Sequence, residues 1–130
     1  MARWQDVRTF IHAQYSATDV SDDLIKLVFK VDDERSQLVF IGRELLMGGS
    51  EEWVMVASPF APRAGTDLSK ALDLVSRMVC GGMSSIGEYL VLKHSLPLAN
   101  MDNNELLRPL QLVVTSADQL EKDLLGTDAL

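Results

Sequence analysis

The stretch from Gly87 to His94 holds the side chains of this sequence that are best suited to chemistry. Four of them fall within eight residues: Glu88, Tyr89, Lys93 and His94. A histidine and a carboxylate are common general bases and acids. The stretch also alternates as a strand does, which places Glu88 and His94 on one face and Tyr89 and Lys93 on the other. We therefore interpret it as a strand, which Pro97 ends or holds at a sheet edge.

His94 is the strongest catalytic candidate of this stretch. Glu88 lies six residues before it, roughly 20 Å along an extended strand, so the two cannot be direct partners. A structural histidine near the strand end is the preferred interpretation. The alternative is a small-ligand sensor or an enzyme with a pocket around His94, Glu88 and Tyr89, which a deep cavity with convergent polar groups would favour.

The usual motifs of catalysis and metal binding do not occur elsewhere in the sequence. Two histidines, His12 and His94, and the single cysteine, Cys80, show none of the paired spacings of metal ligands. Neither a phosphate-binding glycine loop nor the G-x-S-x-G turn of hydrolases is present. Cys80 follows a predicted helix, and the C-terminal end of a helix disfavours a thiolate. We expect no metal, no cofactor and no enzymatic activity.

Length and composition are typical of one globular domain, residues 1–130, with 47% apolar and 24% charged residues. The formal net charge of −7 argues against nucleic acid and anionic membranes as partners, and it suits a basic or apolar polypeptide. No apolar run reaches the ~18 residues of a membrane span. A lone cysteine cannot form an internal disulfide, which favours a reducing compartment, so we expect a cytoplasmic protein.

Periodicity predicts the elements of the first half of the chain. Residues 2–15 have apolar side chains at helical spacing, and residues 16–23 are expected to form a turn-rich connector. Alternating runs at 23–33, 37–45 and 52–60 predict three strands with short connections, which is typical of an antiparallel meander.

The second half is predicted to hold two further helices around one or two strands. The helix nearer the middle of the chain has Thr66 or Asp67 as its N-cap and an apolar stripe of Leu68, Leu72, Val75 and Val79. It ends at Gly81–Gly82. A bend or short strand precedes the strand of residues 88–95. Asp102 and Glu105 have the spacing of a capping box before the last helix. Pro109 either kinks that helix or begins its regular part, and we prefer the second alternative.

The predicted order is therefore α-β-β-β-α-β(-β)-α, an α+β domain with an antiparallel sheet. Its middle strands are apolar on both faces, and an uncovered apolar face would be adhesive. If the first and last helices lie on opposite faces of the sheet, they cover both faces. If they do not, a homodimer or a bound segment would cover the second face. Our candidate partner-binding surface has Trp53, Met55, Tyr89 and Val91 on one sheet face, with Trp4 and Ile11 of the first helix nearby.

Four stretches stand out beside this order of elements in an acidic chain of this size: "WVMVASPFA" (53–61), "LSKALDLVSRM" (68–78), "YLVLKHSLPLANMDNNEL" (89–106) and "SADQLEKDL" (116–124). In these features the chain resembles the type III secretion chaperone-like fold, and more narrowly the YbjN family of bacterial proteins described as sensory transduction regulators. The resemblance implies a small dimeric protein that binds a polypeptide segment and has no catalytic motif. We therefore expect a non-enzymatic, chaperone-like or regulatory binding module that forms a homodimer; a structural subunit of a larger complex is a third hypothesis.

Overall fold

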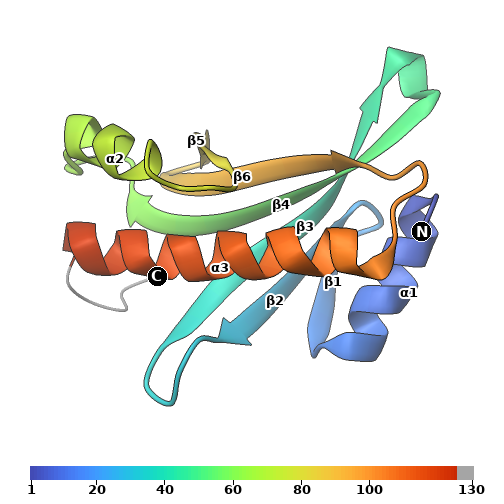
Figure 1. Cartoon of the computed structure of the whole chain (residues 1–130), viewed down its shortest axis with the longest axis horizontal. Coiled ribbons are helices and arrows are strands. Elements are labelled where there is room, and N and C mark those ends of the chain that lie inside the picture. The colour runs from blue at the N-terminus through green and yellow to red at the C-terminus, as the bar shows by residue number, and fades with distance from the viewer. Residues whose placement is uncertain (126–130) are drawn as a thin grey trace.

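The structure is a computed structural model that describes residues 1–125, and in these residues three helices accompany one six-stranded sheet (Figure 1). Along the chain the elements are α1 (Trp4–Gln14), β1 (Ala17–Ser21), β2 (Leu24–Lys30), β3 (Ser36–Leu46), the short 3-10 helix η1 (Met47–Gly49), β4 (Glu51–Pro62), α2 (Leu68–Val75), β5 (Gly82–Ile86), β6 (Tyr89–Pro97) and α3 (Asn103–Leu125). This arrangement confirms the α+β class.

The sheet is antiparallel throughout, with strand order β1-β2-β3-β4-β6-β5. The predicted meander forms its centre. The second, optional strand of the C-terminal half is present as β5, which pairs with β6 through a two-residue turn at Gly87–Glu88. Gly87 has a φ of 57°, and a glycine at the first position of such a hairpin turn adopts this conformation without strain. The two edges of the sheet are therefore β1 and β5.

The expectation of a turn-rich connector at residues 16–23 was wrong, because β1 lies within it. The segment is too polar to show a clear apolar alternation, and four of its five strand residues are exposed. Contacts with α1 hold it instead: the carboxylate of Asp19 accepts hydrogen bonds from Arg8 and His12 at 2.6 Å and 2.8 Å. These hydrogen bonds, that from His12 first, lower the pKa of Asp19. Tertiary contacts therefore determine that this segment forms a strand.

Helix α2 is shorter than its apolar pattern predicts. It begins after Asp67, whose Oδ1 accepts a hydrogen bond from the N–H of Lys70 at 3.0 Å, so the predicted cap is confirmed as Asp67. The helix ends at Val75 rather than near Gly81. Val79, which the pattern placed on the apolar stripe, therefore lies in the following loop and is 94% exposed.

Helix α3 is continuous through Pro109, so the preferred start at Pro109 was wrong. The cap at Asp102 is present, since its Oδ1 accepts a hydrogen bond from the N–H of Glu105 at 2.8 Å. Proline costs a helix the bond to the carbonyl four residues earlier, here that of Glu105 in the exposed first turn. Leu106 and Leu110, fully buried on either side of Pro109, hold the helix against the sheet.

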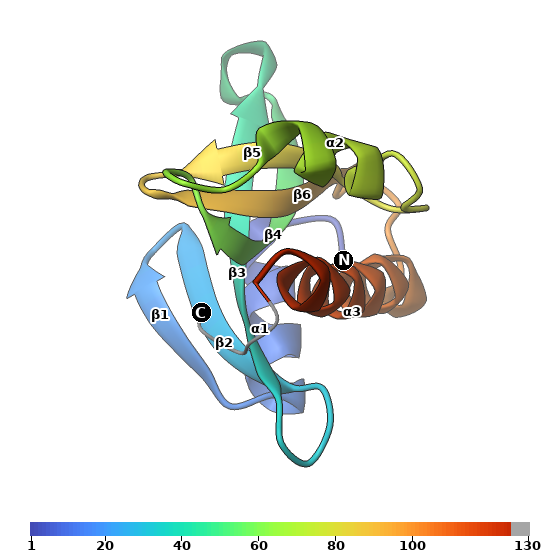
Figure 2. The same cartoon turned by 90° about the vertical axis from the view of Figure 1, so that its left-hand side faces the viewer.

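One face of the sheet, the helix-covered face, packs against all three helices. Side chains of α1 and α3 share a core cluster with six residues of the central strands: Ile25, Leu27, Val39, Ile41, Val54 and Val56. A second cluster joins Ala71 of α2 and Ala117 and Leu120 of α3 to Leu90 and Leu92 of β6. Figure 2 shows α2 and α3 on the same side of the sheet. Within residues 1–125, no helix combines the length and apolar character needed to cross a membrane.

Candidate partner-binding surface

The opposite face of the sheet, the outer face, has no helix over it in the described part of the chain. Register assigns its residues, because paired residues of antiparallel strands share a face. The outer-face residues of the central strands include Lys26, Val28, Lys30, Leu38, Phe40, Gly42, Glu44, Glu51, Trp53, Met55 and Ala57, and those of β6 include Tyr89, Val91, Lys93 and Ser95. The prediction that helices could cover both faces is therefore wrong, because α1 and α3 lie on the same face.

The outer face is apolar at its centre and partly open to solvent. Leu38, Phe40, Trp53 and Met55 are each partly buried, and Val28 is 62% exposed. Smaller residues between them are shielded: Ala57 is fully buried because it pairs with Phe40 on one side and Lys93 on the other. Contiguous apolar surface of this kind on a soluble domain commonly marks an interaction site.

Gly42 allows Met55 to lie across the neighbouring strand. A Cβ at Gly42 would come within 3.1 Å of the Met55 terminal methyl group and 3.3 Å of a Leu24 methyl group. The methionine thus occupies the space that another side chain would take. Because a methionine side chain is flexible and adapts to different neighbours, this position can adjust to a bound segment.

Polar groups at one end of the outer face are paired with one another. Glu44 accepts hydrogen bonds from Lys93 at 3.2 Å and from Ser95 at 2.5 Å. The indole of Trp53 donates to Glu51 at 2.8 Å. These contacts span β3, β4 and β6 beside Met55, so the polar groups at this end of the face are satisfied within the protein.

Of the predicted surface residues, Trp53, Met55 and Tyr89 lie on the outer face, and Tyr89 is 46% exposed at its end. Val91 belongs to the same face but is only 1% exposed, so it supports this surface from beneath. The expectation of an accessible Val91 was wrong, because it lies between β4 and β5, opposite Pro59 and Ser84.

The placement of Trp4 and Ile11 next to this surface was also wrong. Trp4 is 6% exposed and Ile11 is fully buried, both in the core between α1 and the helix-covered face. The indole of Trp4 donates to the carbonyl of Asp22 at 2.7 Å. Amphipathic spacing correctly indicated that these residues are buried, but it did not indicate on which side of the sheet the helix packs.

The residues of the alternative pocket do not converge. His94 pairs with Val56 on the helix-covered face, Tyr89 lies on the outer face, and Glu88 is in the exposed turn before β6. His94 makes no hydrogen bond or ion pair with any of residues 1–125. A base without an orienting partner or a nearby acid lacks the geometry of acid–base catalysis.

A second exposed apolar region, which the sequence did not indicate, follows α2. Leu68 and Leu72, predicted to be core residues, are 48% and 56% exposed. Lys70 donates to the carbonyl of Asp123 at 3.1 Å, so its side of α2 faces α3. At 100° per residue, Leu68 and Leu72 lie on the side of α2 opposite Lys70, so they point away from α3 and into solvent near β5 in the chain. The edge strand β5 has no charged residue between Gly82 and Ile86, although charges commonly protect such edges.

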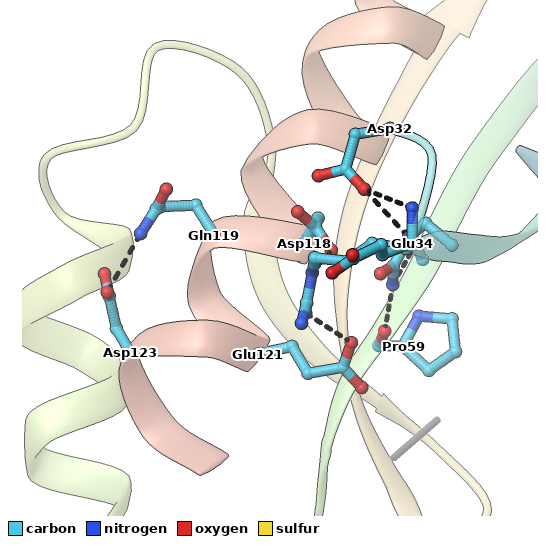
Figure 3. A network of polar contacts seen from close by, with 10 residues as sticks. Asp32, Glu34, Pro59, Asp118, Gln119, Glu121 and Asp123 are labelled. Atoms are coloured by element: carbon cyan, nitrogen blue, oxygen red, sulfur yellow. Dashed lines mark hydrogen bonds and ion pairs between the residues drawn. The ribbon is translucent and has the colours of Figure 1, made fainter. Parts of the chain in front are cut away.

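A buried polar cluster lies beneath the turn between β2 and β3 (Figure 3). Arg35 donates to Asp118 at 2.9 Å and to Glu121 at 3.4 Å, and these two carboxylates of α3 are 5% and 0% exposed. Asp32 accepts from the backbone N–H groups of Glu34 and Arg35, and the first of these bonds is the main cause of its lowered pKa.

Gln37, near the start of β3, is a further buried polar residue. Its amide donates to Ser58 at 3.0 Å and to the carbonyl of Pro59 at 2.6 Å, both in β4. In the hairpin loop before β3, Asp32 and Glu34 are exposed, whereas Arg35 is partly buried. Its guanidinium joins the hairpin to α3. The cluster is placed to stabilise the fold, because it lies under the helix rather than at a surface.

In residues 1–125, no group of three histidine, cysteine, aspartate or glutamate side chains is placed to hold a metal ion. Comparison of this chain with known protein families and with curated proteins finds no match. The outer face and the region around α2 are therefore interpreted from their own geometry.

Proposed function

We propose that this protein is a non-enzymatic binding module of the cytoplasm that holds a polypeptide segment on the outer face of its sheet and works as a homodimer. One observation carries the proposal: all three helices pack on the same face, which leaves Leu38, Phe40, Trp53 and Met55 without a covering layer. Sheets bury their apolar faces against another layer, and because no helix of residues 1–125 supplies that layer here, the surface supports a polypeptide partner.

The resemblance to the type III secretion chaperone-like fold and to the YbjN family agrees with this proposal. It implies a small dimeric protein that holds cargo on apolar surface. The antiparallel sheet with helices on one side, in the order described above, is compatible with that fold. A chaperone-like or regulatory role follows from the resemblance, and the surface itself supports binding.

Site-specific photo-cross-linking tests the binding face. A photoreactive phenylalanine analogue replaces Met55 on the outer face in one variant and Gln111, exposed on α3, in a matched control. After irradiation in the native cytoplasm, we expect defined polypeptide adducts from position 55 and none from position 111. Equal adducts from both positions, or none from position 55, would contradict the proposal.

The region around α2 and β5 supports the homodimer. An isologous contact brings the same patch of two copies together, so an uncharged patch suits it in a chain of net charge −7. The ten residues from Met78 to Gly87 have no charge, and Leu68 and Leu72 flank them. β5 could then pair with β5 of a second copy through its free edge.

Light scattering of the purified protein tests this assembly. We expect a mass of about twice the 14.4 kDa of one chain at micromolar concentration. Leu72→Lys should shift the species toward monomer, because a charge in an apolar interface is costly. Val20→Lys is the matched control, since Val20 is 55% exposed on the opposite edge strand and should leave the mass unchanged. A wild-type monomer at high concentration would rule out the dimer.

A further inference from the structure

Two lysines on the outer face have no acidic partner. Lys26 and Lys30 are exposed residues of β2, and neither makes an ion pair or hydrogen bond with any of residues 1–125. Five other cations, Arg3, Arg8, Arg35, Arg43 and Lys93, each lie within 4.0 Å of a carboxylate. The outer face therefore keeps two lysines available in a protein whose net charge is −7.

The charge of the outer face consequently differs in sign from that of the whole chain. Its basic residues are Lys26, Lys30 and Lys93, and the acidic residues of the same register are Glu44 and Glu51. Both acids already accept hydrogen bonds, Glu44 from Lys93 and Ser95 and Glu51 from Trp53. The β2 half of the face is thus basic, and a partner that meets it has a reason to be acidic.

Exposed apolar side chains separate and flank the two lysines. Val28 lies between them along β2 and pairs with Leu38, while Lys26 pairs with Phe40. Successive residues of one strand face are about 7 Å apart, so a basic, an apolar and a basic group follow one another at that spacing. A hollow of about 310 Å³ adjoins Val28 and Lys30. Asp33 and Glu34 of the hairpin loop form another part of its lining, so Lys26 is the lysine farther from these acids.

The position of these lysines and apolar residues favours a helical partner over a partner strand added at the sheet edge. A strand added at the nearest edge would lie beside β1, one strand beyond β2, and would not cover Leu38 or Phe40 of β3. A helix laid over the sheet contacts several strands at once, as α3 does on the other face. Its apolar stripe would meet Val28, Leu38 and Phe40, and acidic residues beside the stripe would reach the lysines.

We propose that the outer face selects an acidic amphipathic helix, whose apolar stripe packs on Val28, Leu38 and Phe40 and whose carboxylates pair with Lys26 and Lys30. This inference rests on the proposed function and specifies the chemistry of its partner. The lysines provide selectivity, because a segment with basic flanks would place like charges together on the same apolar surface.

A selection from random peptides tests the charge preference directly, because such a library contains acidic, neutral and basic peptides alike. The probe is a phage-displayed library of random peptides of about 16 residues, long enough for four helical turns. Wild-type protein should enrich peptides with net negative charge and apolar residues at spacings of three and four. The Lys26→Glu/Lys30→Glu variant should enrich peptides of positive charge, because the flanks of the surface have changed sign.

A selected acidic peptide is then made with a fluorescent label and titrated by anisotropy. Lys26→Glu/Lys30→Glu should weaken its binding by about tenfold or more, and added salt should weaken the wild-type complex. The control Lys70→Glu/Lys122→Glu makes the same charge change at two exposed lysines of α2 and α3 and should leave the affinity within about twofold. Circular dichroism verifies that both variants are folded.

The outcomes separate this inference from the proposed function. Loss of binding in Phe40→Ala identifies peptides that bind the outer face. If such peptides are neutral or basic, or bind the two charge variants equally, the acidic preference is wrong and the binding face stands. If the library yields no peptide whose binding depends on Phe40, both the preference and the peptide-binding function fail.

Discussion

Along β3 and β4 both faces of the sheet carry large apolar side chains, yet one face is a core and the other is not. On the helix-covered face, Ile41 and Val56 are fully buried, whereas their neighbours Phe40 and Met55 on the outer face stay partly open to solvent. The strands do not cause this difference. The packing of all three helices on one side causes it, so strands that are apolar on both faces do not by themselves show that both faces are buried.

A substitution in the buried polar cluster of Arg35, Asp118 and Glu121 should give the largest loss of stability. Arg35→Met leaves Asp118 and Glu121 buried without their guanidinium, and breaking a buried ion pair in this way typically costs about 3–5 kcal/mol. Urea unfolding measures the change, with Arg77→Met at an exposed position as control. A loss below about 1 kcal/mol would mean that the carboxylates find other partners or water.

Adjacent residues of β3 compare the two faces directly. Ile41→Ala should lower the free energy of unfolding by about 2–5 kcal/mol, because the side chain is fully buried under the helices. Phe40→Ala should cost clearly less stability, since its side chain is partly exposed, but it should weaken partner binding. Unfolding curves and binding titrations of both variants test this contrast. Equal stability losses would show that the outer face is a core in its own right.

Substitutions of His94 and Leu92, which lie on the same face of β6, distinguish a catalytic role from a packing role. His94→Gln should change stability by at most ~1 kcal/mol, because the imidazole makes no hydrogen bond within residues 1–125. Leu92→Ala should cost about 2–5 kcal/mol, since Leu92 is fully buried. Melts and binding assays of both variants decide the point. A stable His94→Gln protein without function would support the alternative of a ligand pocket.

The smallest effect concerns Cys80, which belongs to the core cluster under the helices and is 7% exposed. Burial raises the pKa of its thiol, so less of the reactive thiolate is present at a given pH. Alkylation at about pH 8 should therefore be slower than that of free cysteine. Urea should restore the ordinary rate. A fast reaction in the native protein would show that the loop before β5 opens readily.

The sequence by itself determined most elements and the fold class. Alternation predicted β2, β3, β4 and β6, and side-chain caps predicted the starts of α2 and α3, at Asp67 and Asp102. These signals are local: a period of two or of three to four residues, or one oxygen near a helix end, does not depend on distant segments. The antiparallel meander followed from short connections for the same reason.

Only the tertiary structure decided which surfaces are free. The side of the sheet on which α1 packs, the exposure of Leu72 and the burial of Glu121 each depend on segments far apart in the chain. An amphipathic helix shows that it has an apolar face, but not whether that face meets the core or a partner. Likewise, β1 is polar yet pairs with β2 in the sheet, and Pro109 stays helical because α3 packs on the sheet. Burial and long-range pairing outweigh local preference at these positions, because intrinsic propensity is a weak preference that tertiary contacts override.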